Sequence, residues 1–471
     1  MNICNYIMKK PSIFFFLLCI TLHGFSQGEL SSRTGFYTEE LSPMPEPVSN
    51  NAAIGTEVDG YIFYYSFGGI DSTKTYSGIH NKCWKYNDYE DVWTALPPMP
   101  DSLGRIAAGV SVIDTIAYVI GGYHVFEDGQ ELSFDDVFRF DLKNDVWLEN
   151  GTPIPVKIDD HVQVVYKDSL IYVVTGWSGS GFSGTNVANV QIYNPANDTW
   201  SVGTPVPNTN QYKAFGASGI IVEDTIYYFG GAKISGFNFL PANELRKGSI
   251  NLEDPSIIDW SVMTTDHTAY RSLAWPLNEF TPGAPEDFIH WIGGSANTYN
   301  YDGIAYDGSG GVPARDSSLI YGRFQNAFEA FIGCGGWPEG IIDRMDLRTF
   351  IGYSNREYII IAGGMEADQQ VTGKTTKIFQ TFCSSIDDTP SNLSLRVYPS
   401  PSAGNVYWVN TFQTPVTWVI YNMLGTPVLR MQTEGSGTQS AHMNNKAPGL
   451  YTLCGYDNSG LQIISTTFVI N

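Results

Sequence analysis

One short phrase recurs along this chain and limits what it can fold into: a run of apolar and aromatic residues followed by paired glycines. The second glycines of successive copies are 53, 54, 55, 63 and 70 residues apart. A period of this length indicates repeated supersecondary units. The glycine positions are Gly68, Gly69, Gly121, Gly122, Gly176, Gly230, Gly231, Gly293, Gly294, Gly363 and Gly364, with Thr175 before Gly176 in the third copy.

Each copy carries further signals of a four-stranded antiparallel sheet. Turn residues such as Asp114-Thr115 precede the glycine-ending strand, as expected of a hairpin. Glycine lets the chain turn where a side chain would collide, so the glycines should end the second strand of each sheet. A tryptophan follows each of the first four motifs, and we expect these indoles to be buried between successive sheets. They are Trp93, Trp147, Trp200 and Trp260.

The glycine pairs with the later aromatic residues resemble the Kelch repeat, whose fold is a β-propeller. Six copies imply six blades, and we expect the propeller to occupy residues 27–383. Residues 37–45 repeat the pattern of residues 93–100 without glycines before them. The segment from Tyr37 to Leu41 should therefore pair with the strand around Phe379 and close the last blade, which removes an open edge. Aromatic residues at 14% and charged residues at only 16% suit such an all-β chain.

A second module follows a polar, proline-containing linker at residues 384–392. Short alternating strands punctuated by glycine predict a small Ig-like β-sandwich over residues 393–471. The segments 397–402, 420–422 and 447–451 resemble the C-terminal sorting domain of the type IX (Por) secretion system of Bacteroidetes. The residues that carry this resemblance include Tyr398, Pro399, Gly404, Gly425, Gly449 and Tyr451. It implies the type IX machinery as a partner.

The first residues predict export. Residues 1–26 combine Lys9 and Lys10 with an apolar run at 13–20 and small residues before position 27, which is typical of a signal peptide. This apolar run is shorter than the roughly 20 residues that span a membrane, and no later stretch is long and apolar enough. With the sorting resemblance, the expected location is the medium or the outer cell surface.

Charge and cysteine content narrow the partners. The net charge is −22, with the acidic excess between residues 27 and 392, so nucleic acid is an improbable partner. Four cysteines lie beyond the signal peptide, in no zinc spacing. They are Cys83, Cys334, Cys383 and Cys454, and the sequence does not decide whether any of them pair.

No catalytic residue, metal site or cofactor is predicted. The histidines of the propeller region form no metal-binding spacing. Neighbouring carboxylates such as Asp135-Asp136 and Asp159-Asp160 are interpreted as solvated turn residues, because the chain holds 48 acidic residues. The family resemblance keeps one alternative open, namely that the chain is a carbohydrate-active enzyme. Kelch propellers include galactose oxidase and a sialic-acid epimerase.

The loops after the glycine motifs are long and aromatic, which suits sugar stacking or protein recognition. We therefore expect a binding scaffold for a glycan or a protein. The competing interpretation is that these rings pack over the ends of the blades. The candidate ligand contacts are Tyr123, His124, Trp177, Phe182, Phe237, Tyr299 and Trp337.

Overall fold

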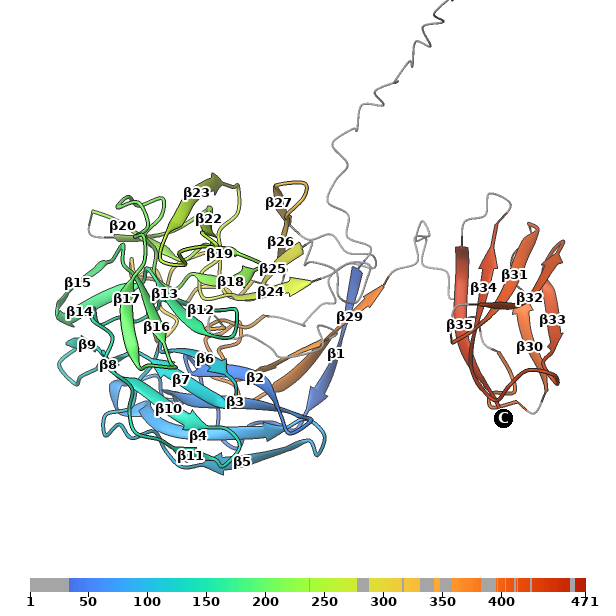
Figure 1. Ribbon diagram of the computed structural model, residues 1–471, viewed down its shortest axis with the longest axis horizontal. Helices are drawn as coiled ribbons and strands as arrows, with labels where there is room; N and C mark the ends of the chain where they lie inside the picture. The colour runs from blue at the N-terminus through green and yellow to red at the C-terminus, as the bar shows by residue number, and fades with distance from the viewer. Residues whose placement is uncertain are drawn as a thin grey trace, which may run out of the picture.

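The computed structural model describes residues 34–236, 238–277, 288–315, 317–330, 343–347 and 358–382, and most of 395–471. In the C-terminal part the described residues are 395, 397–402, 404–410, 412, 414–423, 426–457 and 462–471. Nearly all regular structure in these ranges is β-strand, as predicted, with one 3-10 turn at Tyr76–Gly78 (Figure 1). No helix among these residues has the length and apolar character needed to cross a bilayer. The predicted signal peptide, the linker 384–392, Cys334 and Cys383 lie outside the described residues.

Antiparallel sheets succeed one another along residues 34–382, and we number them in chain order. Sheet 1 contains β2 (Ala52–Val58), β3 (Tyr61–Ile70), β4 (Ile79–Asn87) and β5 (Val92–Leu96). Sheet 2 contains β6 (Gly109–Ile113), β7 (Ile116–Ile120), β10 (Val137–Asp141) and β11 (Val146–Trp147). Sheet 3 contains β12 (Val162–Tyr166), β13 (Leu170–Val174), β16 (Val190–Asn194) and β17 (Thr199–Val202).

Sheets 4 to 6 continue the series. Sheet 4 contains β18 (Ser218–Val222), β19 (Thr225–Phe229), β22 (Glu244–Ile250) and β23 (Ile258–Thr264). Sheet 5 contains β24 (Leu273–Leu277), β25 (Phe288–Ile292), β26 (Leu319–Gly322) and β27 (Ala327–Ala330). Sheet 6, as far as it is described, contains β28 (Tyr358–Ala362), β29 (Thr375–Phe382) and β1 (Thr34–Leu41).

The first strands of sheets 1 to 5 are neighbours in order, since β2 contacts β6, β6 contacts β12, β12 contacts β18 and β18 contacts β24. Apolar side chains fill the space between adjacent sheets, for example Phe67 of sheet 1 with Val119 and Phe140 of sheet 2. The glycine motifs directly follow β7, β13, β19, β25 and β28, so they end the second strand of sheets 2 to 5 as predicted. In sheet 1, Gly68 and Gly69 lie within β3, just before its last residue. We call this end of the sheets the diglycine face and the opposite end the turn face.

Three hairpins and the loop that holds Tyr76–Gly78 extend the diglycine face. The hairpins are β8 (Tyr123–Val125) with β9 (Glu131–Ser133), β14 (Trp177–Gly181) with β15 (Ser183–Asn186), and β20 (Ala232–Ser235) with β21 (Asn238–Pro241). The first two hairpins join into one small sheet, because β14 pairs with β9 at Ser180 and Leu132. The loops after the glycines are therefore ordered strands in these repeats.

The glycine motif joins each sheet to the next through the backbone. The N–H of the second glycine donates to a carbonyl oxygen just before the first strand of the following sheet. The last of these bonds runs from Gly364 to Val48 (2.8 Å), so the series returns to sheet 1. The first glycine has positive φ, and a Cβ at Gly121 or Gly230 would collide with a carbonyl of the next sheet. The other bonds join Gly69 to Arg105 (2.9 Å), Gly122 to Ile158 (2.9 Å), Gly231 to Ala269 (2.7 Å) and Gly294 to Arg344 (2.8 Å).

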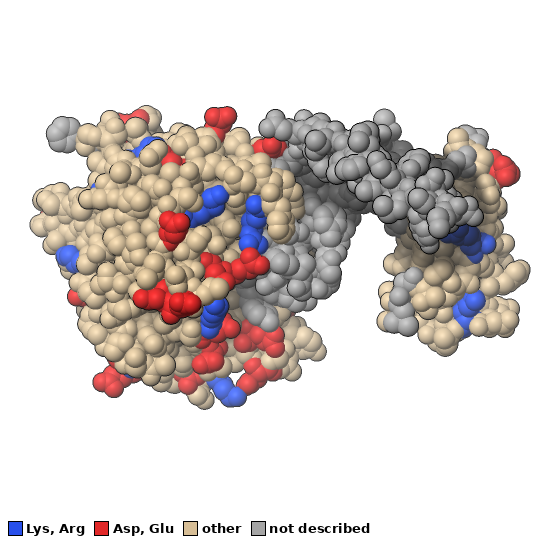
Figure 2. Space-filling view, turned by 45° about the horizontal axis from the view of Figure 1, so that its top comes forward, with Lys and Arg blue, Asp and Glu red and all other residues tan. Residues whose placement is uncertain are grey.

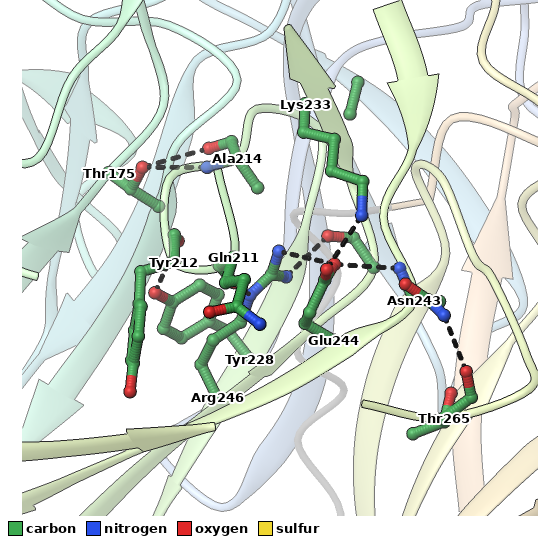
Figure 3. Close-up of polar contacts among 12 residues, drawn as sticks. Thr175, Gln211, Tyr212, Ala214, Tyr228, Lys233, Asn243, Glu244, Arg246 and Thr265 are labelled. Carbon is green, nitrogen blue, oxygen red and sulfur yellow. Dashed lines mark hydrogen bonds and ion pairs between the residues drawn. The ribbon is translucent and has the colours of Figure 1, made fainter. Parts of the chain in front are cut away.

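Sheet 3 makes the same junction with a side chain. Thr175 stands where other repeats have the first glycine, with φ of 48°. Its hydroxyl donates to the Ala214 carbonyl (3.2 Å) and accepts from the Ala214 N–H (3.1 Å), as Figure 3 shows. The hydroxyl thus links sheet 3 to the backbone that precedes sheet 4.

Buried arginines bind the carbonyl of the first glycine in three sheets. In sheet 4, Arg246 donates to the Gly230 oxygen (2.7 Å) and to the Gln211 oxygen (2.7 Å), and lies beside Glu244 and Tyr228 (Figure 3). Arg105 does the same for Gly121 (2.8 Å), and Arg344 for Gly363 (3.5 Å). These contacts satisfy carbonyls that the sharp turn leaves outside the strand ladders.

The four tryptophans tie the outer strands to the preceding sheet. Each indole N–H donates to the carbonyl of a residue that precedes a proline: Ser42, Pro97, Thr152 and Thr204, at 2.7–3.0 Å. Trp93 is buried as predicted, whereas Trp147, Trp200 and Trp260 are half-buried and pack against the apolar layers between sheets. These three indoles lie on outer strands, at the rim of the sheets, where part of each side chain stays exposed.

The N-terminal strand lies where the sequence places it. β1 pairs with β29 along its full length, with Tyr37 opposite Phe379 and their rings stacked at 4.6 Å. Trp93 of sheet 1 donates to Ser42 just after β1 (2.9 Å). The beginning and the end of residues 34–382 therefore share one sheet.

The C-terminal module contains two sheets around one core. β30 (Asn405–Asn410) pairs with β33 (Gly437–His442), and the second sheet has the order β32 (Pro427–Thr433), β31 (Val416–Asn422), β34 (Gly449–Tyr456), β35 (Gln462–Ile470). Trp408 and Trp418, one from each sheet, are fully buried with centroids 5.5 Å apart.

Several sorting-motif residues have clear structural roles. Tyr451 is buried and donates to the Ala447 carbonyl (2.6 Å), which closes the turn through Gly449. A side chain at Gly404 would collide with Asn444. Tyr398 is half-exposed, precedes Pro399 and stacks on Tyr407. Gly425 lies outside the described residues.

Replacing Gly230 with Ala should destabilise the protein far more than replacing Gly236. Both glycines have positive φ, 69° and 63°, but a Cβ at Gly236 meets nothing within 4 Å while one at Gly230 strikes the Ala269 carbonyl. Gly236→Ala should cost about 1–2 kcal/mol for the backbone alone, and Gly230→Ala about 3 kcal/mol or more. Chemical denaturation of both variants measures this, and equal losses would contradict the proposed role of the junction.

Candidate functional site

A ring of residues at the diglycine face marks the mouth of the space between the first strands. In sheets 1 to 5 the residue two positions before the first strand has positive φ: Asn50, Ala107, Asp160, Gly216 and Arg271. Asp346 also has positive φ, and we count it with this ring because the N–H of the next residue, Leu347, donates to the Arg271 carbonyl (2.8 Å). The N–H of Ala107, Asp160, Gly216 and Arg271 donates to the carbonyl of the preceding ring member at 2.8–3.1 Å. Left-handed backbone is costly for Ala and Arg, so the surrounding junctions must enforce it.

Side chains of this ring meet across the axis. Arg271 of sheet 5 donates to Asp160 of sheet 3 (2.8 Å) and to Asp346 of sheet 6 (3.2 Å). Asp346 also accepts from the hydroxyls of Tyr299 (3.1 Å) and Ser49 (2.6 Å). We call Asp160, Arg271, Asp346, Tyr299 and Ser49 the axial cluster. Because sheets 3 and 5 are not adjacent, Arg271 and Asp160 can contact each other only if both side chains point into the space between the first strands.

Segment 295–315 covers the axial cluster. Its Tyr299 is fully buried, and Tyr270 and Tyr299 each lie within 5.5 Å of the Arg271 guanidinium. The segment is held by Lys74, which donates to the Asp302 carbonyl (3.1 Å), and by Thr298, which donates to the Phe239 carbonyl (2.6 Å). Arg271 is therefore fully enclosed.

Burial and charge perturb the titration of the groups around the cluster. Burial raises the pKa of Tyr123 and Tyr270, and the nearby Arg271 cation partly opposes the rise. Burial also raises the pKa of Glu131, the Asp160 carboxylate raises it further, and Arg271 opposes both. Although burial disfavours its charged form, Asp160 and the other acidic neighbours raise the pKa of Arg271. The cluster is a charged network in a dry environment.

Two buried donors at the ring have no partner among the described residues: Arg271 Nε and Asn50 Nδ2. Carboxylates, unsatisfied donors and tyrosines together can bind a polyol or transfer a proton. A substrate would have to displace segment 295–315 first, since both the Arg271 and the Asp346 side chains have no exposed surface.

The structure corrects several expectations about the ligand candidates. Tyr123, His124 and Tyr299 are buried, so the prediction of exposed rings was wrong for them. Tyr123 and Trp177 directly follow the glycines. Each forms an isolated antiparallel β-bridge, Tyr123 with Ile106 and Trp177 with Asp159, so their backbone is held against the neighbouring chain. Trp177 is half-buried against Phe215 and Phe239. Phe237 and Trp337 lie outside the described residues.

The interpretation of Asp159-Asp160 as solvated turn residues was also wrong. Both are buried, with Asp160 in the axial cluster and Asp159 accepting from the Ser133 hydroxyl. Sequence reasoning missed Arg271 and Asp346 altogether. For Arg271 the usable signal is its position two residues before a first strand, but this position becomes visible only after the strands are aligned.

Phe182 fits the expectation of an exposed ring. It lies at the tip of the β14–β15 hairpin with 79% of its surface exposed. Beside it, the tip of the β8–β9 hairpin forms an open cavity of about 610 Å³ lined by Phe126, Glu127, Asp128 and Gln130. Gly129 within this tip faces the Phe182 ring. We call the surface formed by Phe126, Glu127, Asp128, Gln130 and Phe182 the hairpin groove.

Other reactive side chains are enclosed or scattered. Cys83 and Cys454 are free and buried, and burial raises the pKa of both thiols. Burial lowers the pKa of His290 to about 3, so its imidazole is neutral near pH 7. In the described ranges, no three His, Cys, Asp or Glu side chains are grouped to hold a metal ion.

Comparison with protein families matches two parts of the chain. The model of the Kelch motif matches residues 104–149 and 161–207, and the model of the secretion system C-terminal sorting domain matches residues 396–471. The first match covers all four strands of sheets 2 and 3.

Individual relatives are distant. The Kelch-like protein terF of Aspergillus terreus is 28% identical over 180 residues, 37% of each chain. Kelch-like protein 26 of Mus musculus is 27% identical over 133 residues, 28% of this chain and 20% of that protein. The chain thus spans well under half the length of these curated relatives. The solved structure of YjhT superposes with a TM-score of 0.52 at 16% identity, covering 71% of this chain and 95% of that chain, which shows a shared fold.

Removing the central cation should destabilise the protein strongly. Arg271→Ala leaves two enclosed carboxylates uncompensated and should cost about 3–5 kcal/mol. Lys143→Ala, which breaks an exposed ion pair with Asp59, should change the stability far less, because water screens that pair. Adding Asp160→Asn to Arg271→Ala should recover part of the loss, as measured by urea denaturation. If Arg271→Ala matched Lys143→Ala, the cluster would have to be open to water.

Proposed function

We propose that this chain, which carries Kelch motifs and a secretion-system C-terminal sorting domain, is an exported propeller that binds a ligand outside the cell. In this proposal six blades occupy residues 27–383, residues 1–26 are a signal peptide, and residues 393–471 direct export through the type IX machinery. The ligand is a glycan or a protein.

The observation that carries the binding role is the contrast between two sites on the diglycine face. The axial carboxylates are enclosed, whereas the hairpin groove is open and offers an aromatic ring with 79% of its surface exposed. A large exposed ring beside carboxylates and an amide is typical of recognition surfaces. Acidic side chains also gather on the body formed by the sheets (Figure 2), which disfavours polyanionic ligands.

A carbohydrate-active enzyme is the second candidate. The convergence of Asp160, Asp346 and Arg271 at one mouth of the axis favours it, because carboxylates held together in an enclosed site are suited to acid–base chemistry. Catalysis would require segment 295–315 to move. Turnover of any glycan that is lost in Asp160→Asn but kept in Phe182→Ala would support this candidate over the binding scaffold.

Loss of the Phe182 ring should weaken ligand binding. The purified protein would be screened on a glycan array and against outer-surface proteins, and the affinity for the best ligand measured for each variant. Phe182→Ala should weaken binding about tenfold or more, since this ring would be the central contact.

Phe324→Ala provides the control, because Phe324 is similarly exposed (73%) in the turn between β26 and β27 on the opposite face. Equal losses in both variants, or none in Phe182→Ala, would contradict the hairpin groove as the binding surface.

Deleting residues 393–471 should stop export without unfolding the propeller. The two cores share no residue, since one is built within residues 36–378 and the other from residues 397–470. The truncated chain should accumulate in the periplasm, with a thermal transition near that of the propeller in the full chain. Cell fractionation and calorimetry test this, and a truncated chain found at the cell surface would refute the export role.

A further inference from the structure

A second cavity lies at the opposite end of the axis from the axial cluster. Its volume is about 510 Å³, and its described walls come from β2, β6, β12 and β18. These are the first strands of sheets 1 to 4, and each contacts the next. A cavity that touches all four must lie on the inner side of the ring. We call it the axial channel, and it opens at the turn face.

The walls of the channel are apolar and repeat from sheet to sheet. Gly55, Val112, Val165 and Ile221 stand five residues after the ring residues of their sheets and line the channel. All four are half-buried, in strands whose other residues are mostly buried. Apolar side chains that keep exposed surface inside a concave space are suited to an apolar ligand, and this volume lies in the usual range for small-molecule sites.

The mouth of the channel carries two carboxylates without a counterion. Asp114 and Asp168 lie in the turns after β6 and β12 and line the cavity. The matching turn residues in sheets 1 and 4, Asp59 and Asp224, are paired with Lys143 (2.9 Å) and Lys167 (2.8 Å). Within the part of the chain that the structure describes, Asp114 and Asp168 form no ion pair. Among these four turn residues, the negative charge is therefore without an ion-pair partner at the two that line the cavity.

Deeper in the channel, the polar groups are already occupied. Ser111 reaches the cavity, and its hydroxyl accepts from Gln163 (3.0 Å), which in turn contacts His161 (3.0 Å). These bonds lie between the channel and the axial cluster at the other end of the ring. A ligand entering from the turn face would therefore meet apolar walls first and leave its polar end at the mouth.

We propose that the axial channel binds a small amphiphilic cation: an apolar body inserted between the first strands, with an ammonium group at Asp114 and Asp168. The site is distinct from the hairpin groove, which lies on the other face. This second site would bind a ligand of a different chemical class from the glycan or protein proposed for the diglycine face.

Calorimetric titration of the full chain tests the proposal with decylammonium, and with decanoate as the anionic match, below their micellar concentrations. At low salt, decylammonium should bind about tenfold or more tightly than decanoate, because two rim carboxylates attract one and repel the other. The double variant Asp114→Asn, Asp168→Asn should abolish this preference. Asn tolerates the positive φ of both turns, 53° and 47°, so the fold should be kept.

Two further variants locate the site. Asp59→Asn, at the matching but paired turn of sheet 1, should keep the preference. Val165→Phe, which narrows the channel, should weaken both probes, and a thermal melt shows that it is folded. The proposal is wrong if decylammonium fails to bind, if decanoate binds equally well, if Asp59→Asn acts like the rim variant, or if a folded Val165→Phe binds normally.

Discussion

The close approach of two backbones at each glycine motif is the constraint on which the rest of the structure depends. The N–H of Gly231 lies 2.7 Å from the Ala269 carbonyl, and no side chain fits beside that contact at Gly230. Because the same bond recurs at five of the six motifs from Gly69 round to Gly364, and the Thr175 hydroxyl bonds the next sheet at the other, each sheet fixes the position of the next. The apolar layers between sheets, and the indole bonds at the rim, follow from a geometry that the backbone has already set.

This junction also explains why charged residues can meet on the axis. The ring residues are held with positive φ by bonds to their neighbours, and their side chains then converge from sheets that are far apart in sequence. Arg271 joins Asp160 and Asp346 across sequence separations of 111 and 75 residues. An enclosed cluster of this kind costs desolvation, which the attraction between the arginine and the two carboxylates offsets.

The two ends of the axis have opposite character, and the difference has a structural cause. At the diglycine face the loops are long, so segment 295–315 reaches over the mouth and encloses the cluster. At the turn face the hairpins between the first and second strands of sheets 1 to 4 are tight, as at Asp114-Thr115, and the channel is open between apolar walls. Loop length is therefore one feature that separates the two mouths of the axis.

The sequence by itself determined the repeat, the all-β class, the closing strand opposite Phe379 and the sorting module, because each depends on local patterns. Glycine pairs, turn residues and the phrase around Tyr451 act within a few residues of themselves. Only the tertiary structure decided the candidate sites. Hairpin lengths differ between repeats, so nothing in the spacing aligns Asp160 with Arg271 and Asp346, and Asp159-Asp160 resembles an ordinary surface turn. Tyr123 and Tyr299 look like loop aromatics until the neighbouring sheets enclose them. Burial depends on how all the sheets pack together. Whether a residue after the glycines is exposed or enclosed is therefore decided only when the series of sheets has closed.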